Sequence, residues 1–287
     1  MNFLSKTIIS GLVFAMLASC NVFAAKSIKP SNNIISKEVK TDVITGITLS
    51  MNANVVYNQG PVTSLKMKGP DNVIENTIIN NKGGMIEIKL ANDAKITGNF
   101  KKSTFMIYVT SPKISNMIIN GAGEIYVPEH ISTSSLCITV NGAGDISTKG
   151  ITADNDINAI VNGAGDIEMD FTNTASSISA TVTGAGDIEC EKLAVNEANF
   201  IVSGAGDIEV KGGNAKTASI TVSGAGDVNA RHMPTSTVNA VVSGTGDILC
   251  NATTLLNATI IGSGDIRYTG NAKVNCTTRN KPSQIGF

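Results

Sequence analysis

The sequence predicts an all-β fold, a right-handed parallel β-helix (solenoid) with turns of about 20 residues and a less regular N-terminal part. Three observations predict it. A glycine-rich motif ending in an acidic residue occurs eight times, apolar residues alternate with polar ones around each copy, and β-branched residues are abundant. A repeat with a period-two apolar pattern buries its apolar face only when successive copies stack. Parallel crossovers are right-handed in nearly all proteins, which gives the predicted hand.

The composition of the 287 residues excludes several other classes of protein. Charged residues make up 16% of the chain and aromatic residues 4%, with no Trp, whereas hydrophobic residues reach 42%. A helical enzyme would carry more Lys, Glu and Arg, and a disordered chain would hold fewer apolar residues. Because the formal net charge is −1, we expect no basic surface and no nucleic-acid partner.

Residues 1–19 are predicted to be a signal peptide. Lys6 precedes an apolar run that is too short to span a bilayer and fits the central part of an export signal. The segment ends in the sequence Leu-Ala-Ser-Cys, which resembles the bacterial lipobox, so Cys20 is the predicted lipid-attachment residue. Cleavage after Ala24 or Ala25 stays open as the alternative, and it would release a periplasmic or secreted chain without a lipid.

Residues 20–37 are predicted to be a tether, and residues 38–287 a single β-helix domain. Within this domain, residues 38–118 lack the glycine motif but keep the alternation of apolar and polar residues. Turn signals such as Gly69-Pro70 separate the apolar runs. We expect irregular first turns here, with antiparallel pairing left open, which cover one end of the core.

Residues 119–268 hold the regular Gly-x-Gly-Asp repeats. Successive copies are 18 to 21 residues apart and begin at Gly121, Gly142, Gly163, Gly184, Gly204, Gly224, Gly244 and Gly262. Equivalent strands of neighbouring turns should lie about 4.8 Å apart and pair in parallel. Residues 269–287 are then the expected C-terminal cap, because the terminal unit of a solenoid must cover its open end.

In each repeat, three apolar positions are separated from the two glycines by even numbers of residues, so all five positions lie on the same face of a strand. The apolar positions lie six and two residues before the first glycine and four residues after it, as Ile157, Val161 and Ile167 do around Gly163. We expect these side chains to face the core. The glycines are expected at a bend where no side chain fits.

The cysteines of the repeats are predicted to be free thiols. Cys190 and Cys250 hold the same inward position three turns apart, a separation of about 14 Å. A disulfide needs Cα atoms within about 7 Å, so we expect small buried apolar residues instead. The chain has no Cys-x-x-Cys spacing and only two His, so no zinc site is expected.

A column of acidic residues is the one chemical feature of the repeats. Stacked turns would place successive carboxylates about 5 Å apart, where each pair repels by about 0.8 kcal/mol even in water. The column follows Glu124 and consists of Asp145, Asp166, Asp187, Asp207, Asp227, Asp247 and Asp265. It is the candidate ligand or cation site of the chain.

Three interpretations of this acidic column stay open. The structural one is that each Asp accepts backbone N–H groups at a bend. A second polar column supports it, because such side chains can hydrogen-bond along the stack: Asn120, Asn141, Asn162, Thr183, Ser203, Ser223 and Ser243. The second is a row of oxygen ligands for Ca²⁺, the one cofactor considered. The third is recognition of a basic or polyhydroxylated partner.

A polysaccharide-active enzyme is the alternative to a binding module. Retaining glycosidases hold two carboxyls about 5 Å apart, but every rung of the column would satisfy this, so none is identified. His130 and His232 stand alone beside expected turns, and no nucleophile elbow, phosphate loop or zinc-protease motif is present. No catalytic residue is therefore predicted, and the protein is expected not to be an enzyme.

The residues also resemble a known bacterial family, the putative auto-transporter adhesin head GIN domain. The resemblance rests on the run Asp42-Val43-Ile44-Thr45-Gly46-Ile47, on the Gly-Ala-Gly-Asp-Ile repeats and on the closing Tyr268-Thr269-Gly270-Asn271. It spans residues 40 to 275. It implies a β-helical protein of the envelope of Gram-negative bacteria, with adhesion as the implied role.

Together these observations predict a non-catalytic, lipid-anchored β-solenoid of the cell envelope that acts in binding, adhesion or scaffolding. An envelope glycan or protein is the expected partner, with the membrane reached through the lipid. A polysaccharide-active β-helix and a Ca²⁺-binding structural repeat are the alternatives. The ligand and the oligomeric state do not follow from the sequence.

Overall fold

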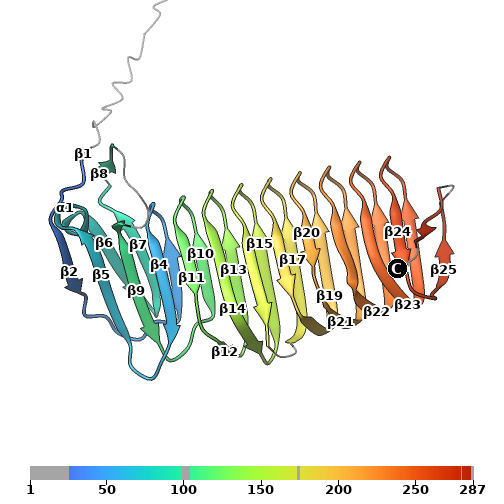
Figure 1. Ribbon diagram of the computed structural model, residues 1–287, viewed down its shortest axis with the longest axis horizontal. Helices are drawn as coiled ribbons and strands as arrows, with labels where there is room; N and C mark the ends of the chain where they lie inside the picture. The colour runs from blue at the N-terminus through green and yellow to red at the C-terminus, as the bar shows by residue number, and fades with distance from the viewer. Residues whose placement is uncertain (1–25, 93, 99–103, 173–174, 279, 286–287) are drawn as a thin grey trace, which may run out of the picture.

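The computed structural model describes residues 26–92, 94–98, 104–172, 175–278 and 280–285, and these form a parallel β-solenoid of about eight turns. Figure 1 shows the turns side by side along one long axis, with the N-terminal strands at one end and the C-terminal strands at the other. Each turn contributes one strand to each of two long walls. The predicted fold class is confirmed.

The first wall holds the strands that precede the glycine motif. Neighbouring strands of this wall pair in parallel throughout. In axial order they are β7 (Met85–Leu90), β3 (Gly46–Leu49), β10 (Asn116–Ile119), β13 (Leu136–Val140), β15 (Asp156–Val161), β17 (Ala175–Val182), β19 (Leu193–Val202), β21 (Gly213–Val222), the second halves of β22 (Val228–Val242) and β23 (Ile248–Ile260), and β25 (Lys273–Cys276).

The second wall holds the strands that follow the glycine motif. From β4 to the C-terminal end they also pair in parallel. In axial order they are β9 (Met106–Ser111), β4 (Asn54–Gln59), β11 (Glu124–Val127), β14 (Asp145–Ala153), β16 (Ile167–Phe171), β18 (Ile188–Glu191), β20 (Ile208–Val210), the first halves of β22 and β23, β24 (Ile266–Thr269) and β26 (Ser283–Gln284); β12 (Ile131–Thr133) pairs with the end of β14.

The core fills the space between the two walls. The column that contains Ile146, Ile167 and Ile188 is fully buried, as are Val161 and Val182 of the opposite wall. The alternation of apolar and polar residues therefore places the apolar side chains inside, as the sequence predicts.

The N-terminal turns are less regular, as predicted, and part of their pairing is antiparallel. The end of the solenoid is covered by β2 (Ile34–Glu38) on β5 (Ser64–Pro70) on β9, by the short helix α1 (Asp71–Glu75) and by β6 (Thr77–Lys82) on β7. The turn of β7 and β9 lies outside the turn of β3 and β4, although it comes later in the chain. Chain order and axial order therefore differ at this end.

The prediction of a tether is wrong for residues 26–37. Residues Lys26–Ile28 form β1, which pairs with β8 (Ala94–Ile96), and Ile34–Glu38 form β2 on the edge of β5. Both partners lie far away in the sequence, so the local composition carried no signal for them. The predicted signal peptide and Cys20 lie outside the described residues.

Candidate functional site: the acidic face of the second wall

The aspartate column lies along the outer face of the second wall, directly after the corner formed by Gly-x-Gly. Six of its seven side chains are exposed and Asp247 is half-buried. Glu124 pairs with Asp145 in the register of β11 and β14, so the column begins in the turn before the first Asp. The structure therefore brings together all the sequence-predicted acidic residues on one face.

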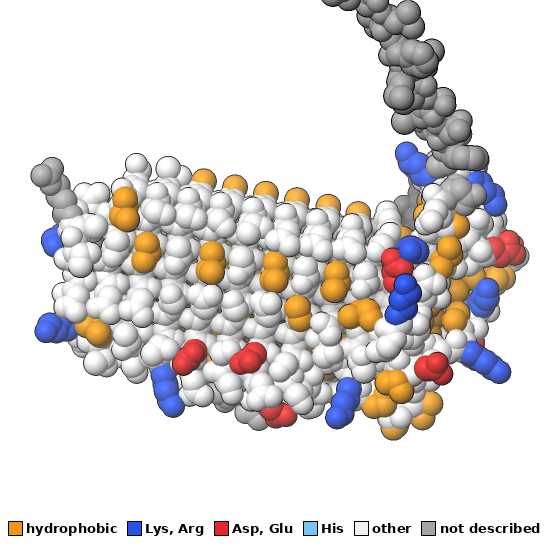
Figure 2. Space-filling model, turned by 180° about the vertical axis from the view of Figure 1, so that it is seen from behind, with side chains coloured by type: hydrophobic (Ala, Val, Ile, Leu, Met, Phe, Trp, Pro, Cys, Tyr) orange, Lys and Arg blue, Asp and Glu red, His pale blue; other side chains and the backbone are white. Residues whose placement is uncertain are grey.

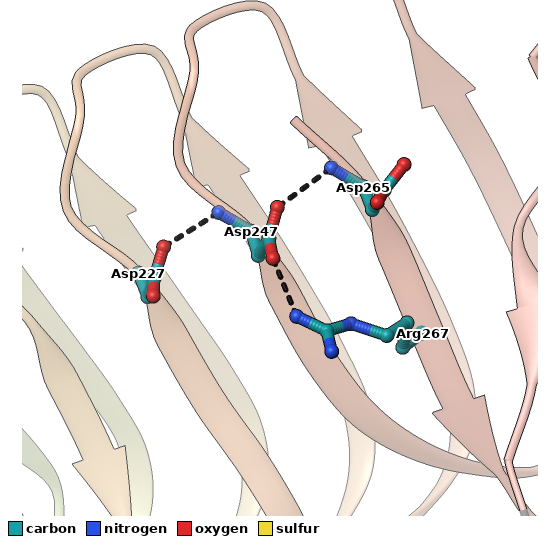
Figure 3. Close-up of polar contacts among 4 residues, drawn as sticks. All are labelled: Asp227, Asp247, Asp265 and Arg267. Carbon is teal, nitrogen blue, oxygen red and sulfur yellow. Dashed lines mark hydrogen bonds and ion pairs between the residues drawn. The ribbon is translucent and has the colours of Figure 1, made fainter. Parts of the chain in front are cut away.

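Each aspartate from Asp145 to Asp247 accepts a hydrogen bond from the backbone N–H of the next aspartate in the column. Figure 3 shows two of these contacts, from the amides of Asp247 and Asp265. The distances from amide nitrogen to Oδ1 are 3.1 Å for Asp166 to Asp145, 2.8 Å for Asp187 to Asp166, 2.7 Å for Asp207 to Asp187, 2.7 Å for Asp227 to Asp207, 2.7 Å for Asp247 to Asp227 and 2.8 Å for Asp265 to Asp247.

This contact supplies an acceptor for the first backbone amide after the corner. Within the corner, the Ala164 amide donates to the Gly142 carbonyl of the preceding turn at 2.9 Å. After it, the Ile167 amide donates to the Asp187 carbonyl of the following turn at 2.9 Å. The Asp166 amide lies between these two residues, and the Asp145 carboxylate accepts its hydrogen bond. One oxygen of each of the six carboxylates from Asp145 to Asp247 thus has a structural role.

The corner glycines are needed because the backbone of the preceding turn lies too close for a side chain. A Cβ atom added at Gly163 would lie 1.8 Å from the carbonyl oxygen of Gly142, and one at Gly165 would lie 1.9 Å from that of Gly144. The prediction that no side chain fits is confirmed. The obstacle is the neighbouring corner and not the opposite wall.

A second acidic column runs beside the first and was missed in the sequence analysis. Glu168, Glu189 and Glu209 are register partners in β16, β18 and β20. The step of 21 and 20 residues between them, two residues after each Asp, was the signal that could have found them. Together the two columns form the acidic face.

A shallow groove of about 300 Å³ lies between these two columns. Its lining includes Asp187, Glu189, Asp207, Glu209 and Asp227. One oxygen of Glu189 accepts a hydrogen bond from Lys211 and one oxygen of Glu209 accepts one from Asn229. The second oxygens of these glutamates and of the aspartates are available along this groove to a ligand.

Few basic side chains neutralise the acidic face among the described residues. Lys211 contacts Glu189, and this hydrogen bond raises the pKa of the Lys211 ammonium. Arg267 contacts Oδ2 of Asp247 at 2.5 Å, the one rung of the aspartate column with an ion pair in the described chain (Figure 3). The central aspartates of the column, Asp187, Asp207 and Asp227, are exposed and form no ion pair in the described chain.

The outer face of the first wall is polar but almost uncharged. The amide Nδ2 of Asn141 donates to Oδ1 of Asn120, and that of Asn162 donates to Oδ1 of Asn141, both at 2.8 Å. Thr183 continues the column with a 2.8 Å hydrogen bond to Asn162. The predicted polar column is therefore hydrogen-bonded along the stack from Asn120 to Thr183. Figure 2 shows a long face on which charged side chains are sparse over the repeats.

The remaining candidate groups do not join the acidic face. His130 is exposed and contacts Thr152, while His232 is exposed within β22 and accepts from Arg231, so the turn expected beside His232 is wrong. Cys190 and Cys250 are buried free thiols, as predicted.

Within the described ranges, no group of His, Cys, Asp and Glu is arranged to hold a metal ion. No helix in that part of the chain is long and apolar enough to cross a membrane.

Comparison with known proteins identifies one family. The family model described as "Putative auto-transporter adhesin, head GIN domain" matches residues 44–211 and 157–272. No curated protein matches the chain.

Solved structures share the fold at low sequence identity. A putative adhesin from Parabacteroides distasonis is 20% identical with a TM-score of 0.67, covering 90% of this chain and 99% of its own. A putative lipid binding protein from the same species and a putative adhesin from Parabacteroides merdae are each 19% identical with TM-scores of 0.65, covering 91% of this chain and 100% of their own. At these identities the likeness shows the fold alone.

Proposed function

Because the chain belongs to the family described as putative auto-transporter adhesin, head GIN domain, we propose that it is a non-catalytic binding module of the bacterial envelope that holds its partner on the acidic face. The observation that carries the proposal is the groove between the two acidic columns, which runs across successive turns. Repetition of the same groups turn after turn suits an extended ligand, whereas a catalytic centre needs one irregular cluster.

The chemistry of the acidic face favours a partner that carries amino groups or several hydroxyls. The second oxygen of each Asp and the carboxylates of Glu189 and Glu209 are hydrogen-bond acceptors with net negative charge. An envelope glycan or a basic segment of an envelope protein offers the matching donors. Such contacts are individually weak at an exposed surface, so several turns would act together.

We further propose that a lipid on Cys20 holds the module at a membrane of a Gram-negative envelope. The support is the Leu-Ala-Ser-Cys sequence after a short apolar run. The mass of the mature N-terminus tests this directly. A lipid-modified N-terminal Cys20 is expected, and a chain that starts at Ala25 or Lys26 would replace the lipid-anchored protein with a soluble one.

A paired set of variants tests the acidic face as the binding site. The double variant Asp207→Asn, Glu209→Gln removes two charges from the groove but leaves an oxygen that can accept the amide of Asp227. Binding to an array of neutral, acidic and amino-sugar glycans is expected to fall several-fold for the amino sugars. The matched control is Glu197→Gln, an exposed carboxylate on the first wall, which should bind as the parent protein does.

Equal binding by the double variant and the parent would remove the acidic face from the proposal. The same array distinguishes the polysaccharide-active alternative, because an enzyme would release soluble sugar from a bound glycan. Sugar release that is lost in the double variant and kept in Glu197→Gln would replace the proposed function with an enzymatic one.

A further inference from the structure

The charge of the chain is divided between its two ends. Residues 26–113 contain twelve lysines against six acidic residues, a formal charge of +6. Residues 114–287 contain nine Lys and Arg against seventeen acidic residues, a formal charge of −8. The near-neutral total of the chain therefore conceals a solenoid with a positive N-terminal end and a negative body.

Exposed apolar side chains gather at the same positive end. Among the described residues, five of the six exposed large hydrophobic side chains lie between residues 34 and 108: Ile34, Val43, Val62, Ile78 and Tyr108. Val62 is 71% exposed and Val43 is 64% exposed. Figure 2 shows hydrophobic side chains interspersed with Lys at the end that carries the first strands.

The covering layer of this end presents both kinds of side chain. Lys66 and Lys68 are exposed on β5, Lys37 and Ile34 on β2, and Ile78 on β6. A groove of about 600 Å³ opens beside them between residues 38–42 and 63–66, where two lysines balance two acids. The excess positive charge therefore comes from the surrounding lysines and not from this groove.

The N-terminal segment of the chain reaches the molecule at this end. β1 begins at Lys26 and lies beside the covering layer (Figure 1). The six-residue step from Cys20 to Lys26 can span at most about 20 Å. A lipid on Cys20 would hold the positive end close to the bilayer surface and leave the negative body at a distance.

We propose that the N-terminal end of the solenoid docks on a bilayer surface rich in anionic phospholipid, so that the repeats project away from the membrane. The lysines attract the negative lipid surface, the exposed aliphatic side chains enter its headgroup layer, and the negative body is repelled. This orientation rests on the proposed envelope location, and it would present the acidic face to partners outside the membrane surface.

Lysine acetylation footprinting tests the proposal on the full chain. The protein is reconstituted in vesicles of phosphatidylcholine alone and in vesicles rich in phosphatidylglycerol, and each exposed lysine is quantified by mass spectrometry. In the anionic vesicles Lys37, Lys68 and Lys82 are expected to be protected several-fold. Lys149 and Lys216, which are exposed on the repeats, should react equally in both.

Variants separate the docking from the anchor. Lys68→Gln, Lys82→Gln should lower the protection of Lys37, whereas Lys149→Gln, Lys216→Gln should not change it. High salt should remove the protection, because the Debye length falls from about 10 Å at 0.1 M to about 3 Å at 1 M. Flotation with the neutral vesicles reports the anchor by itself, so the anchor and the docking can fail independently.

Three results would overturn the docking. The first is equal labelling of Lys37, Lys68 and Lys82 in neutral and anionic vesicles. The second is protection of Lys149 and Lys216 by the anionic vesicles, which would lay the solenoid flat on the surface. The third is protection that grows with protein concentration without vesicles, which would assign the positive end to the acidic face of a second copy.

Discussion

A carboxylate that accepts a backbone amide can be replaced by asparagine but not by alanine, and the aspartate column provides this comparison. Asp207→Ala removes the acceptor of the Asp227 amide and should lower the free energy of unfolding by about 1–2 kcal/mol. Asp207→Asn keeps an acceptor oxygen and removes repulsion from its neighbours, so it should be near neutral. Denaturant unfolding of the three proteins measures both effects.

The last rung supplies the control for this prediction. The Asp265 carboxylate accepts no hydrogen bond among the described residues, although its own amide donates to Asp247. Asp265→Ala should therefore cost much less than Asp207→Ala. Equal losses at the two positions would mean that the carboxylates stabilise the fold in another way than through the amides.

The cysteines differ in environment, and their reactivity should follow it. Burial raises the pKa of the Cys190 and Cys250 thiols to about 12. Burial also opposes ionisation of Cys276, but hydrogen bonds with Thr278 and the charge of Lys281 outweigh it and lower its pKa. Because the thiolate is the reactive form, iodoacetamide at pH 8 should modify Cys276 in the folded protein and spare the buried pair. Peptide mapping measures this, and rapid labelling of Cys190 would contradict it.

At the scale of the element, each corner depends on the one before it. Gly184→Ala would place a Cβ atom 1.8 Å from the Gly163 carbonyl oxygen, and backbone must move to relieve the clash. The free energy of unfolding should fall by about 3 kcal/mol. Ala185→Ser at the exposed middle position is the control, because Ser263 holds that place in the last corner. Similar unfolding midpoints for the two variants would refute the close approach.

The link between β1 and β2 depends on the ionised carboxylate of Asp71. Its Oδ1 accepts from Ser31 Oγ at 2.5 Å and its Oδ2 from Asn33 Nδ2 at 2.8 Å, and these hydrogen bonds lower the pKa of Asp71. Because the pKa is lowered in the folded protein, the stabilisation is fully present at pH values above the pKa of an unfolded carboxylate. It is lost as the pH falls through the lower value of the folded protein.

Acidification should therefore loosen the segment around residues 31–33. Hydrogen exchange of this segment, corrected for intrinsic rates, should accelerate as the pH falls below about 4. Asp71→Asn should exchange fast at every pH, and Glu75→Gln on the same helix should keep the transition. Exchange in the parent that does not change with pH would contradict this role of Asp71.

At the scale of the molecule, the repeats could be predicted from the sequence because every side chain in them has a counterpart one turn away. The buried positions of Ile146, Ile167 and Ile188 and the stacked Asn141 and Asn162 follow from counting alone. For the aspartates, the structural interpretation predicts that each carboxylate accepts a backbone N–H group, but not which one. The spacing of the residues does not reveal which backbone amide each carboxylate accepts.

The N-terminal end could not be predicted in detail because its partners are distant in the sequence. β2 pairs with β5, and the later turn of β7 and β9 lies outside that of β3 and β4. No glycine motif marks these turns, so nothing in residues 38–118 fixes their axial order. Residues 26–37 resemble a tether in sequence because the strands that pair with them, β8 and β5, are also distant in the sequence.

The negative body of the solenoid makes its stability depend on salt. The charge of −8 on residues 114–287 meets few basic partners in the described chain, so repulsion along the acidic face opposes folding. Raising NaCl from about 0.01 M to 0.15 M shortens the Debye length from about 30 Å to 8 Å and screens this repulsion. The melting temperature of the full chain should rise by a few degrees.

The choice of cation then decides whether the aspartate column binds calcium specifically. Screening alone predicts equal melting temperatures in CaCl₂ and MgCl₂ at matched ionic strength, and a smaller salt effect in Asp166→Asn, Asp187→Asn, Asp207→Asn. These substitutions remove charge but keep acceptors for the amides of the following turns. A rise with millimolar CaCl₂ that exceeds the rise with MgCl₂ and reverses with EDTA would instead make the column a set of Ca²⁺ ligands, because Ca²⁺ accepts flexible oxygen coordination that Mg²⁺ does not.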